Sequence, residues 1–379
     1  MRNAFFIFCI CMVACTSVHQ YDEANTIISF SSDNPDRQDS LFDVRYIKLE
    51  TNDNCLLKTM GQMGMVSDSL LLVLDIGNKL LYAFNQDGKY LCCIGAKGGG
   101  PGEYLIPTSF FIDKSRKSVG IIDIGRQKVI YYRMNNLLYQ SETDLPFETT
   151  CCAVAENGNM LWNSTGYASG SIGDNYFVLT DKDFKVVQTA ADKLFKSGYQ
   201  MGDSRNVYAF GGKTYAYSPF DLSLWEIGAD SIKKVVRFDL DNHSAPPVSF
   251  LMEKSEGGSK PYFSELENSD YVSYYTIREF ADYYCVLYIV NNERFIDFFD
   301  KMTGRSYLFT IKELQKYLDT GKMNYLLSGF LNEYSVFPLM VSDLLEEKSQ
   351  GVFFHKKLES LLQNASPDDN PILMCVRLK

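Results

Sequence analysis

The sequence predicts an all-β fold made of six copies of one four-stranded antiparallel unit. The main observation is a repeat. Residues 74–82 align with residues 122–131 with one insertion, which places Asp75 and Asp123 48 positions apart. A period of about 40 to 50 residues with four strands per copy is typical of β-propeller blades. The chain is also rich in aromatics that favour strands, with 25 Tyr and 26 Phe against 2 Trp. We therefore predict a six-bladed β-propeller of four-stranded antiparallel blades.

The first blade displays the unit most clearly. Apolar runs at 70–74, 80–84 and 90–94 have the pattern of strands, and the Asp87-Gly88 pair supplies the backbone freedom that a hairpin turn needs. Strands of the next blades follow from the repeat and from similar runs. In the third to fifth blades they are predicted at 160–162, 176–179 and 186–187, at 207–210, 214–217, 224–227 and 235–238, and at 274–277, 284–290, 295–299 and 307–309.

The last blade lacks one strand in its own part of the chain. It has strand patterns at 334–337 and 372–376, and between them a helical spacing of apolar residues from Phe353 to Gln363. The segment from Val44 to Leu49 is the remaining strand near the N-terminus. We predict that it pairs with residues 372–376, closes the ring and removes an exposed sheet edge.

The N-terminus has the features of a bacterial export signal. Arg2 precedes an apolar stretch, Ala4 to Ala14, which is too short to span a bilayer. It ends in Met12-Val13-Ala14-Cys15, which resembles a lipobox, so Cys15 is predicted to be lipidated after cleavage. The alternative is an ordinary secretory signal cut near Ala14 or Ser17. The predicted organisation is a signal peptide at 1–14, a flexible tether at 15–40 and the propeller at 41–379.

Thr16 favours the outer membrane, because Asp after the lipidated Cys would resemble an inner-membrane retention signal. The periplasmic or surface side is left open. Membrane association is predicted through the lipid anchor only.

Charge and cysteine content exclude several classes of function. The formal net charge of −10 disfavours nucleic-acid binding. Three isolated histidines argue against a His-rich metal site, and we predict no metal and no cofactor. Seven cysteines follow Cys15 without C-x-x-C spacing, and we expect small core residues. A disulfide among Cys92, Cys93, Cys151 and Cys152 is the alternative.

Three segments resemble a known family. They are residues 84–104, which include Gly98-Gly99-Gly100-Pro101-Gly102-Glu103-Tyr104, residues 217–227, and the C-terminal residues 368–379. Together with the lipobox they resemble the six-bladed, NHL-like β-propeller lipoproteins of anaerobic gut bacteria. The resemblance implies a fold and an envelope location. It implies no reaction.

No catalytic motif is present, so candidate site residues come from loops. A phosphate loop and a nucleophile elbow are both missing from the sequence. We predict ligand contacts at Glu103, Tyr104, Arg126 and Tyr217 near the rim of the ring. The alternative is that the glycine-rich segment only turns the chain between blades and that Tyr104 packs on the next blade.

The strand order also predicts which end of the ring binds. Links between blades and turns between second and third strands should meet at one end, together with a long insertion at 241–270. The other end should carry tight turns, such as Asp113 to Ser115, that offer little to a ligand. The favoured function is a non-catalytic module that binds a glycan, a peptide or a partner protein. The runner-up is a periplasmic hydrolase or lyase acting on a small sugar or peptide.

Overall fold

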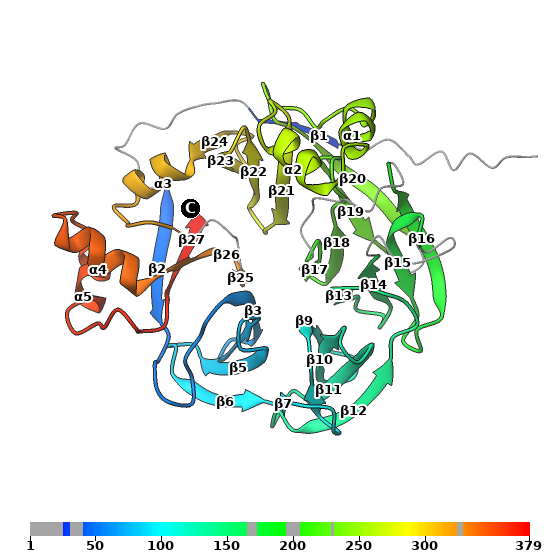
Figure 1. Ribbon diagram of the computed structural model, residues 1–379, viewed down its shortest axis with the longest axis horizontal. Coiled ribbons are helices and arrows are strands. Elements are labelled where there is room, and N and C mark those ends of the chain that lie inside the picture. Colours follow the sequence, from blue (N-terminus) through cyan, green and yellow to red (C-terminus); the bar gives the residue numbers. More distant parts are fainter. Residues whose placement is uncertain (1–25, 31–40, 165–172, 195–204, 229–230, 324–328) are drawn as a thin grey trace, which may run out of the picture.

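Six mainly antiparallel blades stand around a central axis like those of a propeller (Figure 1), and a parallel bridge between β25 (Gly329–Leu331) and β3 (Met60–Ser67) joins the sixth blade to the first. The computed structural model describes residues 26–30, 41–164, 173–194, 205–228, 231–323 and 329–379. The first five blades each have four strands in sequence order from the centre outward, to which blade four adds a fifth at its outer edge, and the last blade has a different strand order. The predicted fold class is confirmed.

Blades one to three are continuous in the sequence. Blade one has, innermost first, β3 (Met60–Ser67), β4 (Leu70–Asp75), β5 (Leu80–Asn85) and β6 (Tyr90–Ile94). Blade two has β9 (Pro107–Asp113), β10 (Ser118–Asp123), β11 (Lys128–Arg133) and β12 (Tyr139–Asp144). Blade three has β13 (Cys152–Val154), β14 (Met160–Asn163), β15 (Asn175–Thr180) and β16 (Val186–Asp192). Two short strands, β7 (Ala96–Lys97) and β8 (Glu103–Tyr104), pair with each other in the link between blades one and two.

Blades four and five follow the same order. Their strands are β17 (Val207–Phe210), β18 (Lys213–Ala216), β19 (Ser223–Ile227) and β20 (Ile232–Asp239); and β21 (Val272–Glu279), β22 (Tyr283–Val290), β23 (Glu293–Asp300) and β24 (Ser306–Thr310). The link between them is a helical hairpin, α1 (Val248–Ser255) and α2 (Ser259–Glu267), and α3 (Ile311–Tyr317) follows β24.

Blade six is built from the two ends of the propeller. From the centre outward it contains β25 (Gly329–Leu331), β26 (Tyr334–Leu339), β27 (Ile372–Leu378) and β2 (Phe42–Lys48). In Figure 1 the blue β2 lies beside the red β27. Their antiparallel register joins Val44 to Val376, and Leu49 N–H continues the contact to the Pro371 carbonyl. The predicted closure of the ring by these two strands is confirmed.

The core consists of layers between neighbouring blades. Each interface in the described part of the chain has its own cluster of buried apolar side chains; for example, Leu81 and Ile130 pack between blades one and two. The blades therefore stabilise one another by burying apolar surface.

The predicted tether needs a correction. Residues Thr26–Ser29 form β1, which pairs in parallel with β20 as a fifth, outermost strand of blade four. Ile28 and Phe30 are buried in the cluster between blades four and five, and burying such side chains holds this segment against the ring.

The helices differ most from the sequence prediction. The helix expected from Phe353 to Gln363 is present as the shorter α5 (Lys356–Leu361), preceded by α4 (Val341–Ser349) in the same insertion between β26 and β27. The insertion at 241–270, expected as a long loop, contains α1 and α2. No described helix has the length and hydrophobicity required to cross a membrane.

The strand order defines two ends of the ring. Links between blades and turns from second to third strands leave one end, which we call the hairpin face because α1 and α2 belong to it. Turns from first to second and from third to fourth strands leave the other end, the turn face. The insertion at 241–270, predicted for this end, is such a link, and the hairpin face also receives the links and turns at 76–79, 98–104, 125–127 and 218–221.

Candidate functional site

Tyr104 is a structural residue of the interface between blades one and two. Its side chain is fully buried, its hydroxyl donates to the Ile94 carbonyl at 2.6 Å, and the same oxygen accepts from Leu81 N–H at 3.0 Å. Burial raises the pKa of this hydroxyl far above its ordinary value. Tyr104 therefore packs in the apolar cluster between blades one and two, close to the alternative reading, but its hydrogen bonds go to blade one.

Glu103 and Arg126 hold the glycine-rich link together. The Glu103 carboxylate accepts from Gly100 N–H at 2.8 Å and also lies where a Cβ on Gly98 would be. Arg126 donates to the Glu103 carbonyl at 2.6 Å and to Glu142 at 3.0 Å. The space that the glycines leave beside the backbone is therefore filled by the side chain of Glu103 from the same segment.

Tyr217 also belongs to the core. It is 2% exposed, and its ring centroid lies 5.8 Å from that of Tyr275 in blade five. Of the four predicted ligand contacts, Tyr104 and Tyr217 therefore present almost no surface, while Glu103 and Arg126 are engaged within the fold. Ligand binding by these residues stays a prediction, and the geometry does not bring the four together around a cavity.

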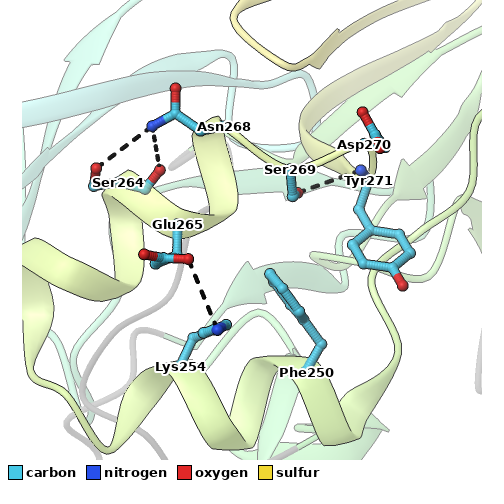
Figure 2. Close-up of a pocket in the computed structure, with 8 residues that line it drawn as sticks. All are labelled: Phe250, Lys254, Ser264, Glu265, Asn268, Ser269, Asp270 and Tyr271. Carbon is cyan, nitrogen blue, oxygen red and sulfur yellow. Dashed lines mark hydrogen bonds and ion pairs between the residues drawn. The ribbon is translucent and has the colours of Figure 1, made fainter.

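The insertion at 241–270 provides a pocket that the sequence did not reveal (Figure 2). It has a volume of about 470 Å³ between α1, α2 and the link to β21. Its lining residues are mostly polar and include two aromatic rings: Phe250, Lys254, Ser264, Glu265, Asn268, Ser269, Asp270 and Tyr271.

The two rings form an apolar corner in this pocket. Phe250 on α1 and Tyr271 after α2 meet edge to face, with centroids 5.2 Å apart and planes at 63°. Both side chains are partly exposed. An aromatic corner bordered by hydrogen-bonding groups is the usual composition of a site for a small polar ligand.

Polar groups surround that corner. Lys254 forms ion pairs with Glu265 at 3.7 Å and with Glu253 at 3.1 Å, and its pKa is raised mainly by the hydrogen bond to Glu253. Asn268 donates to the Ser264 carbonyl at 2.7 Å, which fixes the end of α2. Asp270 is exposed at the end of the hairpin. The pocket can therefore offer two carboxylates, one amide, hydroxyls and one ammonium group.

The hairpin is held in place by its own small core. Leu251, Tyr262 and Leu266 are fully buried and cluster with Phe220 from the second-to-third-strand turn of blade four. Gly258 has φ of 92° between the two helices, a conformation that favours glycine. The walls of the pocket are thus fixed on the ring before any ligand arrives.

The cysteines are thiols, and burial raises the pKa of several of them. No disulfide joins the seven cysteines in the described part of the chain, so the alternative of a disulfide among Cys92, Cys93, Cys151 and Cys152 is not seen there. Burial raises the pKa of Cys55 to about 12 and that of Cys93 to about 11. Such thiols stay protonated at neutral pH, unlike an activated nucleophile. Within the described ranges, no three His, Cys, Asp or Glu side chains group as metal ligands would.

Comparison with known proteins agrees with this architecture. Residues 17–338 match the model of a family described as DUF5128, 6-bladed beta-propeller. A crystal structure from Bacteroides fragilis, provisionally named as that of an exported protein, is 39% identical with a TM-score of 0.89, and the match covers 93% of this chain and 100% of that one. A DUF4221 protein from Bacteroides vulgatus shares the fold at 9% identity with a TM-score of 0.54, over 89% of this chain and 98% of that one. No curated protein matches. The chain belongs to the DUF5128 family of six-bladed β-propellers.

Proposed function

We propose that this chain is an exported lipoprotein, anchored through Cys15, whose propeller binds a glycan in the pocket of the α1–α2 hairpin. The observation that carries the binding site is the aromatic corner of Phe250 and Tyr271 inside a rim of hydrogen-bonding side chains. Apolar faces of a sugar ring pack on aromatic rings, and its hydroxyls match carboxylate, amide and hydroxyl groups.

Export is supported by the leader and by one similar structure. The apolar stretch from Ala4 to Ala14 ends at the lipobox-like Met12 to Cys15. The 39%-identical protein from Bacteroides fragilis carries a name that assigns it to the exported proteins. Location on the outer membrane, as suggested by Thr16, is part of the proposal.

The anchor is tested by replacing single cysteines. Cys15→Ser should release the protein from the membrane fraction, because no lipid can be attached. Cys11→Ser, four residues earlier in the same leader, is the matched control and should fractionate like wild type. Unchanged membrane association of Cys15→Ser would end the lipoprotein part of the proposal.

The pocket is tested by binding to a glycan panel, with a peptide panel as the second arm. Tyr271→Ala should weaken glycan binding at least ten-fold, because it removes one wall of the aromatic corner. Asp270→Asn should weaken it with no effect on the thermal midpoint, since that side chain is exposed.

The matched control is Phe353→Ala, which removes a ring that is 88% exposed and lies outside the pocket. It should bind like wild type. Binding of peptides only would replace the glycan by a peptide ligand. Equal binding by all variants would exclude this pocket.

One observation favours the runner-up function, a hydrolase or lyase. Glu265 and Asp270, two carboxylates, both line the pocket, and glycoside hydrolysis commonly uses such a pair. Incubation of bound glycans with wild type and with Glu265→Gln distinguishes the two functions. Cleavage that the Glu265→Gln variant lacks would identify an enzyme; intact glycans after prolonged incubation support a binding module.

A further inference from the structure

A second pocket opens on the turn face, where the sequence analysis expected little to hold a ligand. It has a volume of about 710 Å³ and belongs to blade two. Four of its seven lining residues are cations and none is acidic: Lys114, Arg116, Lys117, Arg133, Met134, Asn135 and Gln140. This concentration of positive charge contrasts with the net charge of −10 of the whole chain.

One of these cations is a fixed wall of the pocket. Arg116 forms an ion pair at 3.4 Å with the buried carboxylate of Asp113, and its guanidinium lies 5.0 Å from the centre of the Tyr131 ring. It also donates to the Lys182 carbonyl of blade three. Asp113 thus neutralises Arg116, and three charges remain.

Those three charges are available to a ligand. Lys114, Lys117 and Arg133 are exposed, and no ion pair joins them to a carboxylate in the part of the chain that the structure describes. Three cations around one pocket, without acidic partners, attract an anion with several oxygens.

Backbone hydrogen bonds order the two turns that carry these side chains. Met134 N–H donates to the Lys117 carbonyl at 2.9 Å and joins the two turns that form the pocket. Leu137 N–H closes the second turn on the Arg133 carbonyl at 2.8 Å. Because the backbone of both turns is already ordered, binding costs less backbone conformational entropy.

The fold does not require this charge. The corresponding first-to-second-strand turns carry Asp68 in blade one, Glu156 in blade three, Asp282 in blade five and Glu333 in blade six, while blade four has two glycines. The basic turn is therefore a property of blade two and calls for a reason other than folding.

The direction of β1 relates this pocket to the anchor. β20 runs from the turn face to the hairpin face, and β1 is parallel to it, with Thr26 paired to Val236 and Ser29 to Asp239. The chain therefore enters β1 from the side of the turn face. This step rests on the anchoring through Cys15 proposed above: a lipid attached there tethers the end of β1 that points to the turn face.

We infer that the pocket of Lys114, Lys117 and Arg133 binds a phosphate ester, and that the phosphate belongs to an anionic lipid headgroup of the membrane that holds the anchor. The three cations match the phosphate oxygens, and the tether brings this face toward the membrane surface. The hairpin pocket on the opposite face then points away from the bilayer.

The experiment uses residues 16–379, which contain every described element but no lipid. Sedimentation with vesicles of phosphatidylglycerol mixed with phosphatidylcholine is compared with vesicles of phosphatidylcholine alone, at low and at high salt. The wild type should bind only the anionic vesicles, and salt should weaken binding. The triple variant Lys114→Gln, Lys117→Gln, Arg133→Gln should bind about five-fold less per cation removed, on the order of a hundred-fold in all.

The matched control is Lys58→Gln, Lys97→Gln, Lys260→Gln, which removes three exposed lysines from links of the hairpin face. It changes the net charge equally and should bind vesicles like wild type. A parallel titration with glycerol phosphate distinguishes the source of the phosphate. Binding of glycerol phosphate alone, lost in the pocket variant, would keep the phosphate site but assign it to a soluble ligand.

Equal loss of vesicle binding in the turn-face pocket variant and in its control variant would overturn the inference. So would the absence of binding both to vesicles and to glycerol phosphate. Glycan binding by the triple variant of the turn-face pocket is measured in the same preparations. Since the two pockets lie on opposite faces, failure of one site is distinguishable from failure of the other.

Discussion

Asp75 and Asp123, the residues that reveal the repeat, are buried anchors for backbone N–H groups. Asp123 ends β10, and its carboxylate accepts from Leu105 N–H at 2.9 Å, Ile106 N–H at 2.8 Å and Gly125 N–H at 3.1 Å. Asp75 does the same in blade one. Each aspartate joins the incoming link of its blade to the turn after the second strand. The spacing of 48 residues therefore reflects the architecture of a blade, with no need for a ligand.

Replacing Asp123 should destabilise the protein in proportion to the hydrogen bonds lost. Asp123→Ala leaves three N–H groups without this acceptor and should lower the free energy of unfolding by about 3 kcal/mol. Asp123→Asn should cost less, because Asn163 at the equivalent position of blade three accepts from Thr150 and Cys151 N–H through its amide oxygen. Urea unfolding measures both. Equal losses for Ala and Asn would contradict this account.

Asp297 on β23 should make stability depend on pH. It is 1% exposed, and burial raises its pKa to about 8, although hydrogen bonds from the Tyr307 and Phe298 backbone and from Ser306 oppose this. The pKa of Asp297 is higher in the folded state than in the unfolded state. Its contribution to the free energy of unfolding is therefore fully present below about pH 4. This contribution is lost as the pH rises through about 8.

The variant Asp297→Asn should remove that dependence. Its urea midpoint should change less between pH 5 and pH 8 than that of wild type, and it should be the more stable protein at the upper end. A steeper or unchanged slope in Asp297→Asn would show that other groups set the pH dependence.

At the scale of elements, strands were predictable from sequence and most helices were not. The strands of blade five carry long apolar runs such as Tyr283–Val290, and such a run predicts a strand whatever packs against it. By contrast, α1 has eight residues between Pro246-Pro247 and a Gly257-Gly258 pair, and α2 has nine residues directly after that pair, so the local signals indicated a loop. β1 has four residues within a polar stretch, and only its pairing with β20 makes it a strand.

The candidate site was missed for the same reason. Phe250 and Tyr271 are far apart in sequence and meet only because α1 and α2 fold back on each other. The glycine-rich segment attracted attention through Glu103 and Tyr104, but their partners are backbone groups such as the Gly100 amide and the Ile94 carbonyl, which no sequence motif displays. The sequence indicated which residues form turns. It could not indicate the cavities between turns, because these depend on contacts between residues that are distant in the sequence.

The docking of β1 can be tested with two neighbouring residues. Ile28 is 7% exposed and Ile27 is 66% exposed on the same strand. Ile28→Ser should detach β1 and speed hydrogen exchange of the β20 amides that it covers, at a cost of roughly 2 to 4 kcal/mol in local stability. Ile27→Ser is the control and should exchange like wild type. Identical exchange in both variants would show that β1 is not held by its buried face.

At the scale of the whole molecule, stability depends on closure by β2. This strand pairs with β27 through seven residues, from Phe42 with Leu378 to Lys48 with Ile372. Deleting residues 41–51 should abolish cooperative urea unfolding, because it exposes the edge of β27 and the layer between blades five and six. Deleting residues 26–30 removes only the outermost fifth strand of blade four and should leave one cooperative transition. Cooperative unfolding of the first variant would contradict the role of closure.

The closure also sets an order of events for the exported chain proposed above. Asp43 on β2 contacts Arg377 on β27, and the two are 334 residues apart. β2 is among the first strands to cross a membrane and its partner is the last. At a synthesis rate of about 5 to 20 residues per second, β2 waits tens of seconds for β27 if export keeps pace with synthesis. During that interval the ring is open, and the chain can still be moved through a membrane as an unfolded segment. Its early blades expose apolar edges to which periplasmic chaperones can bind. The ring can thus close only after β27 has also crossed the membrane and paired with β2.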